Sequence, residues 1–367
     1  KEGSWLVINM DVVQRAQAAI GRQRKVGEGD PGFILFHAPF SICSEKVRTT
    51  LHETGIPFVS HEVNIQFQEN YNPDYVALRL LAWKDMGEPP MVAETEVKWN
   101  GGSSLSATGF DPCVVPTLVD VRGDVPKVIV DSKLICEYLV ATPEGERLMP
   151  KDRTALLLVA KHIKMVDETP HVALLYDGIG EGDTRPYYMK VLLGASVHKT
   201  QVDKLKKRLC EEGTTWTGDL MKRAYTAKLN KTVAGENASK LVAAHDDEYQ
   251  KQAVAKVMDI LRTMDEDLAK SSGDWLTGSD FTLADIFAGV SLHRLLLLGD
   301  GKLYDDLSYV KAFADKSFAR AALQDEVLFY PGILPSYHMS ELCGKYRGPL
   351  AGFMQDRKTD MLNAFAH

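Results

Sequence analysis

The chain has 367 residues, of which 45% are hydrophobic and 25% charged, as in an ordinary soluble globular protein. Its 43 basic and 50 acidic side chains give a formal net charge of −7, which disfavours a nucleic-acid-binding surface. No stretch approaches the ~18–20 uninterrupted apolar residues of a membrane-spanning helix, so we expect no integral membrane segment. Because a single domain usually has about 100–200 residues, we expect two packed units.

The cysteine content indicates neither a disulfide framework nor a metal site. The number of cysteines, five, is odd, and no two of them form a CxxC pair. They are Cys43, Cys113, Cys136, Cys210 and Cys343. We therefore expect no metal and a reducing, cytoplasmic location.

The N-terminal part of the chain alternates between strand and helix patterns. Residues 1–32 end in the turn-rich GEGDPG and are interpreted as an N-terminal extension ahead of the first structural unit. From Phe33, the apolar run FILFH predicts a strand, and CSEKVRTTLHETG predicts a helix that ends at Gly55. PFVSHEV predicts a second strand, which completes a β-α-β unit.

The remainder of this unit is predicted to contain a helix, an insertion, a hairpin and a last helix. NPDYVALRLLA has helical spacing, whereas residues 82–112 lose periodicity and gather Gly, Pro and Ser, which indicates an insertion loop. The β-branched runs VVPTLVD and KVIVD predict a hairpin, and Ser132 can cap the helix that follows. Residues 33–140 thus have the β-α-β-α-β-β-α order of an α/β thioredoxin-like domain.

The second half of the chain has helical patterns only. A polar connector with two prolines, ATPEGERLMPKD, marks the boundary. Residues 153–330 have apolar spacing near 3.6, which predicts an all-α C-terminal domain, and residues 331–367 are interpreted as a tail. Within this domain, GSDFTLADIF places Thr282 and Asp285 at the spacing of a capping box, so we expect this motif to start a buried helix and not to act in catalysis.

Cys43 lies where the first strand gives way to the first helix. Helix N-termini favour anions and lower the pKa of cysteine thiols in general, and Ser41, Ser44 and Lys46 add hydroxyl groups and a positive charge nearby. The pattern therefore allows a reactive thiolate. The alternative is a small buried residue that fills the corner between strand and helix.

Two further motifs allow a binding function or a purely structural one. Pro116 stands in a predicted strand, and it either begins the strand or follows a cis Val115–Pro116 bond that would offer the Val115 backbone to an extended peptide-like ligand. Asp131 and Ser132 open the last helix of this unit, where the hydroxyl and the N–H groups can receive a ligand carboxylate. The alternative for Asp131 and Ser132 is a plain helix cap.

Taken in order, these motifs resemble the glutathione transferase superfamily over roughly residues 33–329. SICSEKVR resembles the serine-x-cysteine-serine signature of its zeta-like branch, although Ile42 stands where the isomerases have a second serine, which disfavours isomerase activity. A closer resemblance is to the glutathione-dependent hydroquinone reductive dehalogenases. It is carried by FSICSEKVR, NYNPDYVALRL, GFDPCVVPTLVD, DSKLICEYL, TPHVALLYDG and FTLADIFAGVSLHRLLLLG.

The resemblance implies a glutathione transferase fold and glutathione as co-substrate. It implies that Cys43 is the catalytic nucleophile and that Ser41 stabilises the glutathione thiolate. The other residues implied to bind glutathione are Val115, Pro116, Asp131, Ser132 and Lys46. In this interpretation, glutathione displaces halide from a halogenated hydroquinone, and Cys43 then removes the glutathionyl group as a mixed disulfide.

The aromatic substrate site is harder to assign from the sequence. His171, Tyr176 and Arg185 lie where the superfamily places a helix beside this site, and they are candidates for holding a phenolate, although a single His or Tyr on a helix is often a packing residue. Cys113 is a less favoured second thiol. Three other functions stay open, namely a β-aryl-etherase, a cis-trans isomerase and a non-catalytic glutathione-binding or aromatic-binding protein. The superfamily also implies a homodimer.

Overall fold

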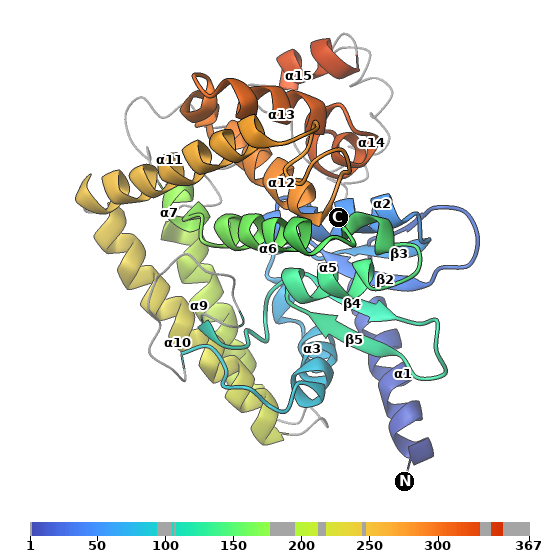
Figure 1. Cartoon of the computed structure of the whole chain (residues 1–367). Coiled ribbons are helices and arrows are strands. Elements are labelled where there is room, and N and C mark those ends of the chain that lie inside the picture. Colours follow the sequence, from blue (N-terminus) through green and yellow to red (C-terminus); the bar gives the residue numbers. More distant parts are fainter. Residues whose placement is uncertain are drawn as a thin grey trace. The chain divides into compact units, whose positions relative to one another are not determined.

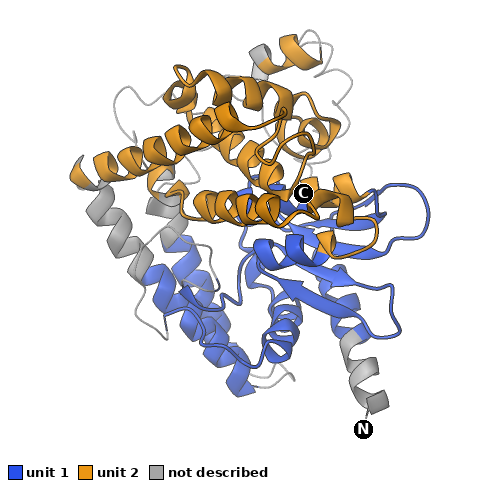
Figure 2. Cartoon of the chain, in the orientation of Figure 1, with its two compact units in different colours: residues 1–47, 55–138, 192–246 blue, residues 48–54, 139–191, 247–367 orange. Residues whose placement is uncertain are grey.

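A computed structural model describes most of the chain. The described residues are 2–93, 105, 108–176, 195–211, 218–243, 247–330 and 339–347. Contacts divide the chain into two compact units (Figure 2). Unit 1 comprises residues 1–47, 55–138 and 192–246, and unit 2 comprises residues 48–54, 139–191 and 247–367. Each unit draws on both halves of the sequence, and the domain boundaries predicted at residues 140 and 153 stay a proposal.

Unit 1 is built on a five-stranded sheet (Figure 1). The strands are β1 (Gln23–Val26), β2 (Phe33–His37), β3 (Phe58–Glu62), β4 (Thr117–Asp120) and β5 (Lys127–Val130). Their order is β1-β3-β2-β4-β5, and only β2 and β3 pair in parallel. This confirms the predicted β-α-β unit and hairpin. The sequence patterns did not reveal β1, whose QRKV sequence is polar and mostly exposed.

Helices α1 (Glu2–Ala19) and α3 (Pro73–Asp85) pack against each other and cover one face of the sheet. Alternate residues of each strand point to one face, so Ile34 and Phe36 of β2 enter the same core as α1 and α3. On α1, Val13 and Ala16 are buried in this core. Much of the predicted N-terminal extension is therefore an integral part of unit 1.

The other helices of unit 1 come from distant parts of the sequence. They are the first part of α2 (Ile42–Thr54), most of α5 (Ser132–Val140), α9 (Ala195–Cys210) and α10 (Gly218–Ala243), with a 3-10 turn, η1 (Glu69–Tyr71). Leu205 of α9 and Ala224 and Tyr225 of α10 join the core with α1 and α3. Two helices of the sequence's second half thus share the core of the sheet.

Unit 2 is helical throughout its described residues, apart from one isolated bridge between Trp275 and Gly278. Its α-helices are α6 (Arg153–Asp167), α7 (His171–Tyr176), α11 (Asp247–Lys270), α12 (Leu283–Leu298), α13 (Ser308–Phe318), α14 (Ala321–Leu323) and α15 (Met339–Tyr346). Short turns η2 (Glu146–Leu148), η3 (Gly301–Tyr304) and the π-helical η4 (Gln324–Leu328) connect them. This confirms the predicted helical character of the region.

Helix α12 is the buried centre of unit 2 and packs against α6, α13 and α14. Thr282 and Asp285 form the predicted capping box, with the Thr282 N–H donating to Asp285 Oδ2 over 2.7 Å. The Leu276 N–H donates to the other carboxylate oxygen over 2.9 Å. Burial nevertheless raises the pKa of Asp285 to about 6. The motif is structural, as the sequence predicted.

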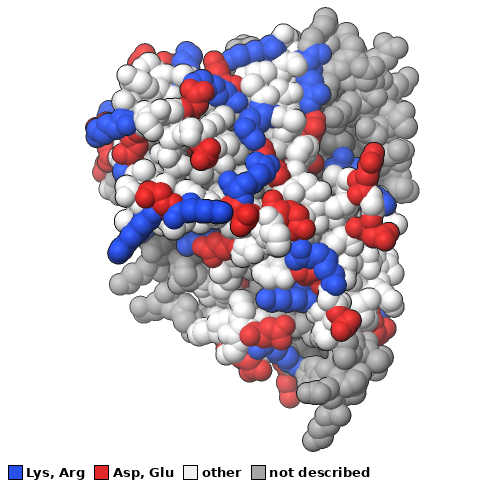
Figure 3. Space-filling model, turned by 45° about the vertical axis from the view of Figure 1, so that its right-hand side comes forward, with Lys and Arg blue, Asp and Glu red and all other residues white. Residues whose placement is uncertain are grey.

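The described surface carries charges of both signs. On the face in Figure 3, basic and acidic side chains are interspersed among the residues that are coloured. In the described part of the chain, no helix combines the length and the apolar character needed to cross a membrane.

Candidate active site

The N-terminus of α2 follows β2 by a short turn that Ser41 completes. The Ser41 side-chain Oγ accepts a hydrogen bond from the Ser44 N–H over 3.3 Å, and the Ser41 carbonyl accepts one from the Glu45 N–H over 2.8 Å. Ser41 is therefore the N-cap, and Cys43 lies in the first turn with a partly exposed side chain. Among the described residues, nothing accepts a hydrogen bond from the Ser41 hydroxyl.

The bond between Val115 and Pro116 is cis, which is one of the two alternatives that the sequence left open. The strand register places this bond close to the turn before α2. Phe36 at the end of β2 pairs with Thr117, so the chain runs on into Ser41 at the same edge of the sheet where Pro116 enters β4. Thr117 in turn pairs with Val130, so Asp131 also follows at this edge.

Asp131, and not Ser132, caps helix α5. Asp131 Oδ1 accepts hydrogen bonds from the N–H groups of Lys133 and Leu134 over 3.0 and 3.4 Å. The predicted Ser132 cap is therefore wrong, because α5 begins at Ser132 itself and the preceding residue, Asp131, with a backbone φ of +72°, occupies the cap position. The Ser132 hydroxyl forms no hydrogen bond with a described residue, although the side chain is largely buried.

The remaining candidates are spread over the chain. Lys46 lies on α2 and is only 4% exposed. His171 lies on α7 in unit 2, where its Nε2 is 3.2 Å from the Ser291 hydroxyl, which agrees with a packing role. Tyr176 is the last residue of α7, and its side chain lies outside the described part of the structure. Arg185 lies outside the described residues. The structure thus brings together the glutathione candidates of unit 1 but does not test the substrate candidates.

The second half of α2 belongs to unit 2, and a buried arginine fixes it there. The Arg48 guanidinium donates to the Glu326 carbonyl over 2.6 Å and lies 4.0 Å from the centre of the Tyr330 ring. The Glu326 carboxylate also lies 3.6 Å from Nδ1 of His52 and raises the pKa of that imidazole. Within unit 2, the second half of α2 is therefore held by a polar cluster.

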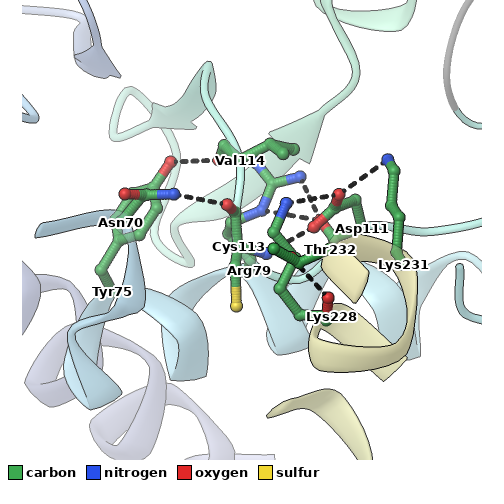
Figure 4. Close-up of polar contacts among 9 residues, drawn as sticks. All are labelled: Asn70, Tyr75, Arg79, Asp111, Cys113, Val114, Lys228, Lys231 and Thr232. Carbon is green, nitrogen blue, oxygen red and sulfur yellow. Dashed lines mark hydrogen bonds and ion pairs between the residues drawn. The ribbon is translucent and has the colours of Figure 1, made fainter. Parts of the chain in front are cut away.

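Sequence reasoning missed the side chains that hold the segment before Pro116 (Figure 4). The Arg79 guanidinium on α3 donates to the carbonyls of Asp111 and Pro116, each over 2.9 Å. Tyr75, one helical turn earlier, donates to the Val114 carbonyl over 2.8 Å. The signal was present in the sequence as a tyrosine and an arginine four residues apart in a helix that is otherwise apolar on this face.

Asp111 connects the same segment to α10. Its Oδ2 accepts hydrogen bonds from the ammonium groups of Lys228 and Lys231, each over 2.9 Å, and its Oδ1 accepts one from the Cys113 N–H (Figure 4). Burial acts to raise the pKa of Asp111, but the two lysines outweigh it and hold the pKa far below its ordinary value. Asp111 is therefore a buried, ion-paired carboxylate.

Cys113 is fully buried, and burial raises the pKa of its thiol well above the ordinary value. A protonated, inaccessible thiol is a poor nucleophile. These properties favour a packing role for Cys113 over the second catalytic thiol considered above. Among the described residues, no group of three or more potential ligand side chains could hold a metal ion.

Comparisons with known proteins place the chain in a family. A model described as the glutathione S-transferase N-terminal domain matches residues 40–142, and one for the C-terminal domain matches residues 243–315. The 2,5-dichlorohydroquinone reductive dechlorinases of two strains of Sphingobium indicum, B90A and UT26, are each 38% identical over 327 residues. The alignment covers 87% of this chain and 89% of each relative.

Among solved structures, the β-etherase LigF of Sphingobium sp. strain SYK-6 is 18% identical, with a TM-score of 0.49 over 80% of this chain and 98% of that one. The N-terminal domain model covers helix α2 with Cys43 and strands β3 to β5, and the C-terminal domain model covers the helical region that carries the capping box. With the relatives that match over most of their length, they establish that the chain belongs to the glutathione S-transferase family.

Proposed function

We propose that this chain is a glutathione-dependent reductive dehalogenase that acts on a halogenated hydroquinone. The observation that carries the proposal is the 38% identity, over 87% of this chain, to proteins named 2,5-dichlorohydroquinone reductive dechlorinase. The match includes nearly the whole length of those relatives, so it is not limited to the general glutathione-binding half.

Glutathione is the proposed co-substrate, bound at the edge of the sheet in unit 1. Its γ-glutamyl end would be held by Asp131 and Ser132, and its cysteinyl backbone would pair with Val115 beside Pro116. The unused hydroxyl of Ser132 and the open backbone groups of Val115 support this placement, because neither forms a hydrogen bond with a described residue. We also propose that Lys46 contributes positive charge to this glutathione site.

The first chemical step is attack by the glutathione thiolate. Ser41 donates a hydrogen bond to this thiolate and stabilises the anion. The hydroquinone, tautomerised so that the halogen-bearing ring carbon is electrophilic, takes up the sulfur and loses halide, which gives a glutathionyl-hydroquinone. The Ser41 hydroxyl suits this role because its oxygen accepts the Ser44 N–H, while its hydrogen has no acceptor among the described residues.

The second step needs the Cys43 thiolate. Cys43 attacks the sulfur of the thioether, the C–S bond breaks, and the ring carbon takes up a proton and leaves as the reduced hydroquinone. A second glutathione thiolate then attacks the mixed disulfide, which releases oxidised glutathione and restores Cys43. Two glutathione molecules thus supply the two electrons that replace halogen by hydrogen. The location of Cys43 in the first turn of α2 supports this role, because the helix N-terminus favours an anion.

The aromatic ring is proposed to be held through its phenolate by His171, Tyr176 and Arg185. The sequence position of these residues supports this, and the contact between His171 and Ser291 leaves the packing alternative in place. We further propose a cytoplasmic homodimer. An odd number of cysteines without CxxC pairs supports a reducing compartment, and the family supports the dimer.

The test is halide release from 2,5-dichlorohydroquinone with excess glutathione and ascorbate to protect the substrate. Wild type should release halide and form oxidised glutathione in equal amounts. Cys43→Ser should release halide but accumulate the glutathionyl adduct, because the second step is blocked. The products would be separated by chromatography and identified by mass spectrometry.

Two outcomes of the same assay would contradict the dehalogenase proposal. Halide release with the thioether as the final product of wild type would indicate a transferase that stops after the first step. No halide from a protein that binds glutathione would refute the dehalogenase proposal, and cleavage of a β-aryl ether under the same conditions would replace it with ether cleavage.

A further inference from the structure

The segment from Asp111 to Thr117, here called the cis-proline segment, is held mainly by side chains of other elements. Asn70 in η1 donates from Nδ2 to the Cys113 carbonyl over 2.7 Å. Tyr75 and Arg79 on α3 hold the carbonyls of Val114, Asp111 and Pro116, as described above. The carbonyl groups on both sides of Val115 are therefore fixed from outside the segment. Figure 4 shows the bond to the Val114 carbonyl.

Arg79 is unusual among these residues because it is a buried cation that forms no ion pair within the described residues. All its hydrogen bonds go to oxygen atoms of the cis-proline segment, namely the carbonyls of Asp111 and Pro116 and the hydroxyl of Thr117, 2.7 Å away. A guanidinium is a planar fork with several donors, so it can bind carbonyls at both ends of a bent segment at once.

Val115 differs from its neighbours. It is partly exposed, and neither its N–H nor its C=O is hydrogen bonded within the described part of the chain. A partly exposed N–H and C=O on one residue can form the paired hydrogen bonds that an extended peptide ligand needs. The held carbonyls therefore bracket the one residue whose backbone we propose to bind glutathione.

We infer that Arg79, Tyr75 and Asn70 are positioning residues for glutathione, which act by holding the cis-proline segment so that the Val115 backbone stays in its binding geometry. The inference rests on the proposed function, because it assigns Val115 to the ligand. It adds three residues on η1 and α3, none of which is itself proposed to touch glutathione. Asp111, with Lys228 and Lys231 of α10, forms an outer layer that fixes the start of the segment.

The chain offers a matched pair of variants to test this inference. Tyr75 and Tyr225 are both buried in the same core, and each hydroxyl donates to a backbone carbonyl, over 2.8 and 2.9 Å. Tyr75 bonds both the Val114 carbonyl and the Thr117 hydroxyl in the cis-proline segment, whereas Tyr225 bonds the Tyr71 carbonyl outside it. Phenylalanine removes only the hydroxyl in each case, so a general loss of core stability affects both variants alike.

Two measurements would be made on the full chain, namely glutathione affinity by titration calorimetry and amide hydrogen exchange of peptides that cover residues 113–117. Tyr75→Phe should weaken glutathione binding by about fivefold, the effect of one ordinary hydrogen bond, and speed exchange in the cis-proline segment. Tyr225→Phe should change neither the glutathione affinity nor the exchange rate by more than about twofold, while it lowers the melting temperature as much as Tyr75→Phe does.

Arg79→Lys gives a second, stronger test. Lysine keeps the charge but not the fork, so affinity should fall further than in Tyr75→Phe, by roughly tenfold or more. Wild-type affinity and exchange in Arg79→Lys, or identical behaviour of Tyr75→Phe and Tyr225→Phe, would overturn the inference. If wild type binds no glutathione, the proposed function fails, and the exchange data still decide whether these side chains hold the segment.

Discussion

Cys43 and Cys113 lie in unit 1 near the same edge of the sheet, yet their surroundings are opposite. Cys43 is partly exposed in the first turn of a helix, next to an N-cap serine. Cys113 is fully buried beside an ion-paired aspartate, and burial raises the pKa of its thiol. The difference teaches that the local environment, and not proximity to the cis proline, decides which thiol can act as a nucleophile.

The largest expected difference is in the rate of thiol labelling. Iodoacetamide should modify Cys43 of the native protein more than about 10³-fold faster than Cys113, because Cys113 becomes accessible only when the core opens. Peptide mass spectrometry over a time course measures both rates in one sample. In concentrated denaturant the two labelling rates should converge. Comparable rates in the native protein would contradict the proposed difference between the two thiols.

Ser41→Ala tests the electrostatic side of the Cys43 region. Loss of one hydrogen bond to a developing or bound thiolate should slow the halide-releasing step by about 10²-fold. Single-turnover halide release isolates this step from the later thiol exchange. Ser44→Ala is a suitable control. The Ser44 hydroxyl accepts a hydrogen bond from the Ala38 N–H and holds the turn, but it is not proposed to contact the glutathione thiolate. Equal loss in both variants would indicate a structural effect only.

Asp111→Asn tests the electrostatic side of the Cys113 region. Removal of this buried charge leaves Lys228 and Lys231 without their carboxylate, so the free energy of unfolding at pH 7 should fall by about 3 kcal/mol. The pKa of Asp111 is lowered on folding, so its contribution is present above the unfolded value of about 3.9 and is lost as pH falls below it. Denaturant unfolding of both proteins should therefore differ most at neutral pH and converge in acid.

The smallest expected effect is that of Cys113→Ala. The change removes a small buried group, which should cost roughly 1 kcal/mol of stability and leave dehalogenation within about twofold of wild type. Steady-state halide release and thermal unfolding check the two parts separately. A loss of turnover without a loss of stability would show that Cys113 takes part in the chemistry after all.

Local sequence signals predicted the parts of the fold that depend on neighbouring residues. The apolar run at Phe33, the hairpin that follows Pro116 and the capping box at Thr282 all belong to this class, and the structure confirms them. The Ser132 cap was predicted wrongly, because the helix begins at Ser132 itself, so the preceding Asp131 occupies the cap position.

Features that depend on distant residues escaped the sequence analysis. The role of Arg79 depends on the cis-proline segment, which comes more than 30 residues later in the chain and packs against α3. The pairing of β1 with β3 joins segments that share no local pattern. The roles of His171, Tyr176 and Arg185 stay predictions, because they depend on how a substrate lies against the helices.

The short strand β1 has a consequence for solubility. It pairs with four of the five residues of β3, from Val26 opposite Phe58 to Gln23 opposite His61, and its Arg24 and Lys25 are exposed. An uncovered β3 would offer unpaired N–H and C=O groups to another chain, which is a common start of aggregation. With β1 in place, the edge of the sheet is a short strand with charged side chains instead of the unpaired edge of β3. A chain that began at Phe33 would lose this protection, even though every residue proposed to act on glutathione would still be present.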